Sequence, residues 1–231
     1  MLNPAFILRR LSTILAVAIL TLTLLAATSG ILIAFYYVPT AGGAYDSLQQ
    51  IDTAIPYGWL VHTLHNLSGN FVIVLGLVQI VVMFLGERFR RSWLTAWISG
   101  ILFTLSAIGL SWTAMILNWN QIGFWRLKIE LGTIEAIPFI GATLRDIITG
   151  GSVGTLTVAH LYTLHSYVVS LAALGLSIVH LGGLLFQEKE MQEEREAALV
   201  VEPVQPAEKA EIEQPAIVQG RAAESEAQSP A

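Results

Sequence analysis

The sequence contains no cysteine and little charge. None of its 231 residues is cysteine, and only 13% are Asp, Glu, Lys or Arg. The lack of cysteine excludes disulfides, thiolate metal sites, iron–sulfur clusters and thioether-attached haem. Soluble domains carry about twice this share of charged residues. With 54% hydrophobic residues and a mean hydropathy of +0.64, the composition is typical of an integral membrane protein.

The few charges fall into two regions. Residues 188–231 contain 11 acidic and 4 basic residues, whereas residues 1–187 contain 6 acidic and 8 basic ones. The acidic segment has no aromatic residue and buries too little apolar surface to offset its chain entropy. We therefore predict a membrane domain, 1–187, and a disordered acidic tail, 188–231. The first part of the tail, to about Val201, is a candidate extension of the last helix. Neither region indicates nucleic-acid binding.

Four long apolar runs predict an all-α bundle that crosses the membrane four times. We expect the spans at Leu11–Tyr37, Tyr57–Leu85, Trp93–Leu117 and Val158–Leu185. The first run follows two arginines, as a signal peptide would. It is longer than the apolar region of a typical signal and ends in an aromatic pair suited to a membrane interface. We therefore interpret it as a retained span.

The connections between the spans differ in length and charge. We expect a polar loop at Val38–Pro56, a short basic turn at Gly86–Ser92 and a longer connection at Asn118–Thr157. Within the last, Ala136–Thr149 is a candidate for short amphipathic helices at the interface, and the glycines that follow indicate a turn. Positive charge gathers at five positions of the N-terminus and the basic turn: Arg9, Arg10, Arg88, Arg90 and Arg91. This predicts that both termini lie on the cytoplasmic or stromal side.

Five histidines lie in or near the apolar runs: His62, His65, His160, His165 and His180. His165 and His180 are 15 residues apart, about 22 Å along a helix and about 60° around it, so they share one face at two depths. A metal-ligating side chain inside a span is costly, which favours a functional interpretation.

Two of the histidines lie at matched depth on different spans. His65 begins the second span and His165 begins the fourth, so two imidazoles facing each other could take both axial positions of a haem iron. The alternative is that they are polar histidines at a membrane interface. We favour that alternative for His62 and His160, because each lies at the outer edge of a span.

Four stretches carry a resemblance to a known family. They are FYYVPT (35–40), PYGWLVHTLHNLSGN (56–70), NWNQIGFWRLKIELGTIEAIPFIG (118–141) and GGSVGTLTVAHLYTLH (150–165). Together they resemble the N-terminal, haem-binding half of the cytochrome b family, nearest to its cytochrome b6 members. The resemblance covers roughly residues 10–187, and the motifs recur in the family's order and spacing. The acidic tail lies outside it.

The resemblance implies a bundle that holds two stacked b-type haems through histidine pairs on the second and fourth spans. His65 and His165 match the ligands of the outer haem, and His180 matches one ligand of the inner haem. The position of its partner is occupied by Gln79, and an amide is a poor ligand for haem iron. We therefore expect one haem b and leave the second open. The inner haem is absent, or His180 binds it alone. In either case His180 is also a candidate for a buried histidine hydrogen-bonded to Gln79 or to a helix carbonyl.

Other family positions are only partly kept. Gly30 and Gly100 match family glycines that allow a macrocycle to pack against the backbone. At three further positions where the family has glycine, this chain has Ala16, Val17 and Ala114. These larger side chains would crowd a porphyrin face.

Further departures concern the outer haem and an additional haem. His62 and His160 stand near the outer haem's propionates, where the family usually has arginines, so the resemblance implies a shifted potential. Leu22 matches the position of the cysteine that attaches an extra haem in cytochrome b6, and we expect that haem to be missing.

We expect this chain to transfer electrons in a membrane through at least one bis-histidine haem, inside a quinone-linked respiratory or photosynthetic assembly. Other electron-transfer subunits, a quinone or quinol and a second copy of the chain are candidate partners. The family's Pro-Glu-Trp-Tyr segment does not occur, so we expect an electron carrier and assign no catalytic residue. Two alternatives remain open: a non-redox or regulatory membrane subunit that kept the scaffold, and a small quinone reductase or oxidase.

Overall fold

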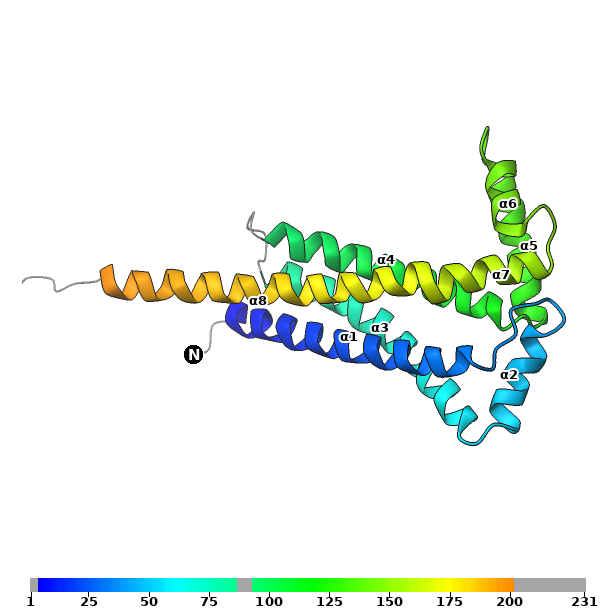
Figure 1. Cartoon of the computed structure of the whole chain (residues 1–231). Coiled ribbons are helices and arrows are strands. Elements are labelled where there is room, and N and C mark those ends of the chain that lie inside the picture. Colours follow the sequence, from blue (N-terminus) through cyan, green and yellow to red (C-terminus); the bar gives the residue numbers. More distant parts are fainter. Residues whose placement is uncertain (1–3, 87–92, 202–231) are drawn as a thin grey trace, which may run out of the picture. The chain divides into compact units, whose positions relative to one another are not determined.

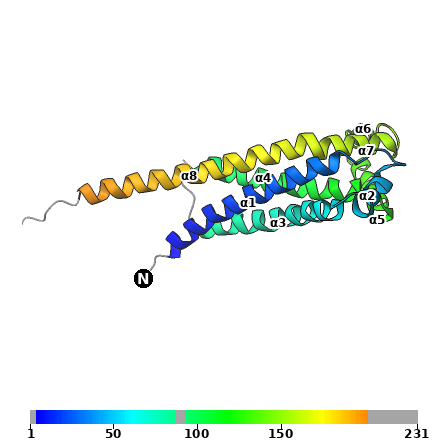
Figure 2. The ribbon, with the colours of Figure 1, turned by 60° about the horizontal axis from the view of Figure 1, so that its bottom comes forward.

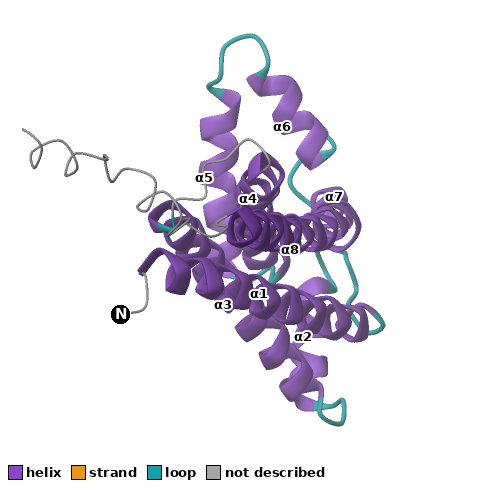
Figure 3. Cartoon of the chain, turned by 90° about the vertical axis from the view of Figure 1, so that its left-hand side faces the viewer, coloured by secondary structure: helices purple, strands orange, loops and turns teal. Residues whose placement is uncertain are grey.

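The computed structural model describes residues 4–86 and 93–201 of the chain, and within these ranges every regular element is a helix (Figure 3). The elements are α1 (Pro4–Ala34), α2 (Ala44–Thr53), α3 (Gly58–Leu85), α4 (Leu94–Leu117), α5 (Gln121–Glu135), α6 (Gly141–Thr149), α7 (Thr155–Thr163), the π-helix η2 (Leu164–Val169) and α8 (Ser170–Val201). Met1–Lys189 forms one compact unit, and a second unit begins at Glu190.

Among the residues that the structure describes, four helical segments are long and apolar enough to cross a membrane: Phe6–Ala34, Gly58–Leu85, Leu94–Leu117 and Thr155–Ala197. This confirms the prediction of an all-α, four-span membrane protein. The fourth segment combines α7, η2 and α8 in one continuous rod. In the first unit the long helices run lengthwise beside one another in both views (Figures 1 and 2). The first span ends at Ala34, earlier than predicted, because Phe35 and Tyr36 form a turn.

The middle of the bundle is held by apolar side chains from all four spans. The buried residues of this cluster are Ile19, Val72, Phe103, Ala107 and Ala173. Serine and threonine hydroxyls within the spans donate to backbone carbonyls one turn earlier, as Thr23 does to Ile19 O at 2.8 Å. Backbone and hydroxyl groups are thus satisfied internally, as a lipid environment requires.

The short helices α2, α5 and α6 lie at one end of the bundle, which we call the loop end (Figure 1). The prediction of a polar loop at Val38–Pro56 is wrong, because α2 occupies its centre. Ala44, Ser47, Leu48 and Ile51 recur at helical spacing and are buried against the bundle. A ten-residue helix gives a weaker sequence signal than a span, and its polar outer face dominates the composition.

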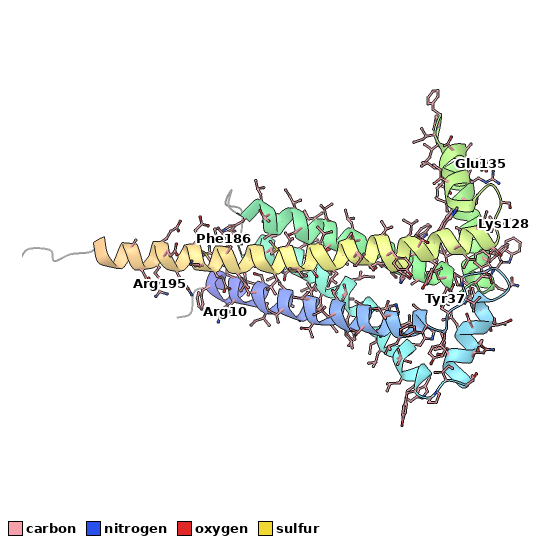
Figure 4. All side chains as sticks on the ribbon, in the orientation of Figure 1. Arg10, Tyr37, Lys128, Glu135, Phe186 and Arg195 are labelled. Atoms are coloured by element: carbon pink, nitrogen blue, oxygen red, sulfur yellow. The ribbon has the colours of Figure 1, made fainter. Side chains whose placement is uncertain are left out.

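The long connection also contains more helix than predicted. The helix α6 falls within the predicted interfacial segment, and the turn that follows is confirmed by positive φ angles at Gly150 and Gly151. The helix α5 precedes it and was not predicted. Its N-cap is Asn120, whose side chain accepts a hydrogen bond from the Gly123 amide at 2.9 Å. Lys128 and Glu135 mark this helix in Figure 4.

The opposite end of the bundle, which we call the Arg10 end, is joined by polar contacts. Arg10 forms an ion pair with Glu188 at 3.4 Å, and the Thr13 hydroxyl donates to the same carboxylate at 2.6 Å. Arg10 lies here in Figure 4. The helix α8 continues to Val201, which confirms the predicted helical extension. The three arginines of the predicted basic turn and the predicted disordered segment beyond Val201 lie outside the described residues.

Candidate functional site

Two histidine rings face each other in the half of the bundle toward the loop end. His65 comes from α3 and His165 from η2, and their ring centroids are 6.2 Å apart with an angle of 61° between the ring planes. A metal ion that bonds to each ring nitrogen at about 2 Å places two imidazole centres about 6 Å apart. The centroid spacing therefore matches that of two imidazoles bonded to one ion. The sequence predicted this pair from matched depth and from the family resemblance.

Each of these rings has its Nδ1 engaged by a neighbouring helix. His65 Nδ1–H donates to the Ala26 carbonyl of α1 at 2.9 Å. His165 Nδ1–H donates to the Thr113 hydroxyl of α4 at 2.8 Å, and that hydroxyl donates in turn to Gly109 O at 3.0 Å. This assignment of protons follows from the hydrogen-bond network. It leaves Nε2 unprotonated on both rings, which is the state that binds a metal.

A glycine permits the close approach of the His65 ring to α1. A Cβ atom at Gly30 would lie 3.0 Å from His65 Cε1, so a larger residue would push the ring away. Gly30 and the accepting carbonyl of Ala26 are one helical turn apart. One turn of α1 therefore both fixes the tautomer of His65 and makes room for its ring. The glycine faces the imidazole directly, a contact that the sequence comparison with porphyrin-packing glycines did not anticipate.

His165 lies in the π-helical stretch of the fourth span. A π-turn closes its hydrogen bonds one residue later than an α-turn and so takes up an extra residue. This matches the intervals along the two facing spans, which are 15 residues from His165 to His180 and 14 from His65 to Gln79. Stretches of this kind are frequent at functional sites.

His180 lies deeper, toward the Arg10 end, and faces a glutamine. Its Nδ1–H donates to Ala96 O at 2.8 Å, and its Nε2 lies 3.0 Å from Nε2 of Gln79. A Cβ atom at Gly100 would lie 2.8 Å from His180 Cε1. This glycine therefore permits the close approach of the His180 ring, as Gly30 does for the His65 ring. The structure thus brings His180 together with Gln79, the residue that occupies the position of the family's second inner-haem ligand.

The remaining two histidines join short helices to the spans. His62 Nδ1 lies 2.8 Å from Asp52 Oδ1, which links α3 to α2. His160 is exposed, and its Nδ1–H donates to Ile148 O at 3.2 Å, which links α7 to α6. Both lie at the loop end, as predicted for histidines at the edge of a span.

A shallow groove of about 570 Å³ runs along α5, away from the histidine pairs. It is lined by Gln121, Ile122, Trp125, Arg126, Ile129 and Glu130. Glu130 accepts hydrogen bonds from Arg126 at 2.9 Å and from Trp112 of α4 at 2.6 Å, which fixes α5 against the bundle.

Burial changes the ionisation of Tyr37 at the loop end. Tyr37 stacks on Tyr162, with ring centroids 5.5 Å apart, and its hydroxyl donates to Leu117 O at 2.8 Å. Burial, and secondarily the neighbouring Tyr162, raises the pKa of Tyr37 well above its ordinary value. The phenol therefore stays protonated and joins α4 to the segment after α1.

Comparisons with known proteins place this arrangement in a family. Residues 6–189 match the model of the protein family described as "Cytochrome b/b6/petB". Cytochrome b6 of Oltmannsiellopsis viridis is 31% identical over 158 residues, which cover 68% of this chain and 74% of that protein. Cytochrome b6 of Mastigocladus laminosus is 32% identical over 151 residues, 65% of this chain and 70% of that protein.

A solved structure has the same fold. A chain of a hyperthermophilic respiratory complex III superposes with a TM-score of 0.63 at 24% identity, covering 75% of this chain and 47% of that one. The match over residues 6–189 covers the first three membrane spans and most of the fourth, and it includes His65, His165 and His180. The chain therefore belongs to the cytochrome b/b6 family.

Proposed function

We propose that this chain is a b-type cytochrome that holds one haem b between His65 and His165. Membership of the cytochrome b/b6 family already makes it an integral membrane protein of electron transfer. The observation that carries the finer proposal is the pair of imidazoles with centroids 6.2 Å apart, each engaged through Nδ1.

The surrounding residues prepare both rings for this role. The Ala26 carbonyl and the Thr113 hydroxyl accept the Nδ1 protons, which fixes the ring orientations and increases the basicity of Nε2. When bound, haem b supplies a reversible one-electron couple of its iron. Because the spans bury the pair in low dielectric, the potential depends on these ring contacts and on charges at the loop end.

Two histidines and a carboxylate supply polar groups near the edge of this site. His62 is paired with Asp52 on α2, and His160 is exposed beside α6. We propose that His62 and His160 stand toward the haem propionates, in the place of the arginines that the family usually has. An imidazole lacks the bidentate fork of a guanidinium and holds a carboxylate less strongly, so we propose that the potential differs from that of an arginine-paired haem.

The chain works beside other redox components. We propose that it belongs to a quinone-linked respiratory or photosynthetic assembly with further electron-transfer subunits. The groove along α5 is where we propose that a quinone or quinol binds, because Trp125 and two isoleucines line it beside the Arg126–Glu130 pair. Arg9 and Arg10 at the far end of α1 support an orientation with the Arg10 end, and hence both termini, on the cytoplasmic or stromal side.

A reduced-minus-oxidised absorption spectrum of the purified chain tests the proposal. We expect a b-type α band that is lost in His65→Leu and in His165→Leu. Val168→Ala changes an exposed side chain of the same π-helix and should retain the band. Absence of the band from the wild-type chain would contradict the proposal and favour a non-redox membrane subunit that kept the scaffold.

A further inference from the structure

At two depths along the bundle, a histidine contacts a glycine-containing turn of a neighbouring helix. We call them the outer level, at His65, and the deeper level, at His180. His65 donates to the first residue of Ala26–Gly30 on α1, and His180 donates to the first residue of Ala96–Gly100 on α4. The turns read AATSG and AWISG, which share the pattern A-x-x-S-G. In both, a Cβ atom on the final glycine would lie 3.0 Å or less from the imidazole. The two levels are therefore built alike on their histidine side.

The levels differ in the side chain that faces the histidine. His65 faces the imidazole of His165, whereas His180 faces the amide of Gln79. Because His180 donates through Nδ1, its Nε2 accepts, and the Gln79 amide donates into it at 3.0 Å. That lone pair is the one a metal would need. Two nitrogens that share a metal ion stand about 4 Å apart, so this pair has no room for one.

The two levels also differ in how completely they are closed. His180 and Gln79 are only 1% and 2% exposed. The carbonyl that His180 contacts belongs to an apolar cluster whose buried residues are Ala16, Met83, Ala96 and Leu184. His65 and His165, in contrast, both keep part of their surface exposed. The residues at the deeper level thus do not fit a second haem.

We infer that this chain binds a single haem and that the Gln79–His180 pair closes the second position with protein side chains. The pair joins three spans instead, because Gln79 lies on α3, His180 on α8 and its carbonyl partner on α4. Closure of the deeper level rests on the Gln79–His180 contact and on the burial of both side chains. The count of one haem per chain rests on the proposed function.

The route of electrons follows from this closure. The deeper level lies about 22 Å along the fourth span from His165. Its closure leaves the described residues without a second ligand pair between the proposed haem and the Arg10 end. Electrons therefore enter and leave at the loop end, and the chain does not conduct them across the whole membrane.

The ratio of haem to full-length chain tests the inference, measured as the pyridine haemochrome of protein purified in detergent. We expect a ratio of one in the wild type, one in His180→Leu and none in His165→Leu. Two haems in the wild type, with one left in His180→Leu, would overturn the inference while leaving the proposed function standing. Complete loss of haem in a folded His180→Leu variant would overturn both. A wild type without haem would overturn both.

A redox titration covers the case in which His180→Leu does not fold. The wild-type α band should titrate as one one-electron component, and two components would overturn the inference. The reverse experiment combines Gln79→His with Ala16→Gly, which restores an imidazole and removes a buried methyl group. We expect the ratio to rise from one to two. A folded double variant with a ratio of one would contradict the role given to Gln79.

Discussion

His65 and His165 depend on contacts made by the ring nitrogen that faces away from the proposed iron. Ala26 O and the Thr113 hydroxyl accept those protons and come from two different helices. A ligand held in this way keeps its rotamer before the cofactor arrives. The cost of ordering the site is thus met during folding, which favours tight binding.

The buried tyrosine at the loop end gives a pH-dependent stability. Since the pKa of Tyr37 is raised in the folded chain, its phenol is neutral in both states below about pH 10. Above that pH the unfolded chain loses the proton and the folded chain keeps it, so the free energy of unfolding falls as pH rises. We expect Tyr37→Phe to remove this part of the alkaline loss and to cost about 1 kcal/mol at neutral pH, through the hydrogen bond to Leu117 O.

Thermal unfolding in detergent across neutral and alkaline pH measures both effects. Tyr45→Phe is a suitable control at neutral pH, because that side chain is exposed on α2. An alkaline loss in Tyr37→Phe as steep as in the wild type would contradict the assignment.

The sequence predicted the facing pair but not what holds it. Matched depth on two apolar runs was sufficient for His65 and His165, because helical rise converts sequence position into depth. The partners Ala26 and Thr113 were not predicted, since they depend on how the helices rotate against each other. The repeated A-x-x-S-G pattern at Ala26–Gly30 and Ala96–Gly100 is a signal that could have revealed them.

Among the elements, α2 shows how a short helix supports the loop end. Its buried side chains pack on the bundle, and its Asp52 pairs with His62 of α3. We expect Ile51→Ala to destabilise the chain by about 2–4 kcal/mol, because Ile51 is only 2% exposed and its loss leaves a cavity. The matched control is Gln50→Ala, which alters the exposed face of the same helix.

Chemical unfolding of the two variants measures the difference. A flexible polar loop at this position would tolerate both changes equally, so equal stabilities would contradict a packed α2. Sequence patterns predicted the first three spans within five residues at each end. They ended the fourth span at Leu185, where the apolar helix runs to Ala197, and they missed α2 and α5. Long apolar runs give a strong signal, whereas short helices depend on tertiary contacts such as the capping of α5 by Asn120.

The whole molecule has the fold of its family, but the two halves of its interior differ in the side chains that face the buried histidines. The four spans, the loop-end helices and the match over residues 6–189 are those of a cytochrome b/b6 protein. Its loop-end half presents two facing imidazoles, and its Arg10 half is closed by a hydrogen-bonded amide and an apolar cluster. The resemblance alone left the second haem open, and the contacts around Gln79 argue against it.

The central claim is that His65 and His165 are the two axial ligands of one haem iron. Electron paramagnetic resonance of the oxidised, purified chain tests it most directly. We predict a low-spin ferric signal of the bis-imidazole type in the wild type, converted to a high-spin signal, or lost with the haem, in His165→Gly. Because free imidazole can occupy the space that this variant leaves, its addition should restore the low-spin signal. A wild-type signal that is high-spin, or one that is unchanged in His165→Gly, would contradict the account.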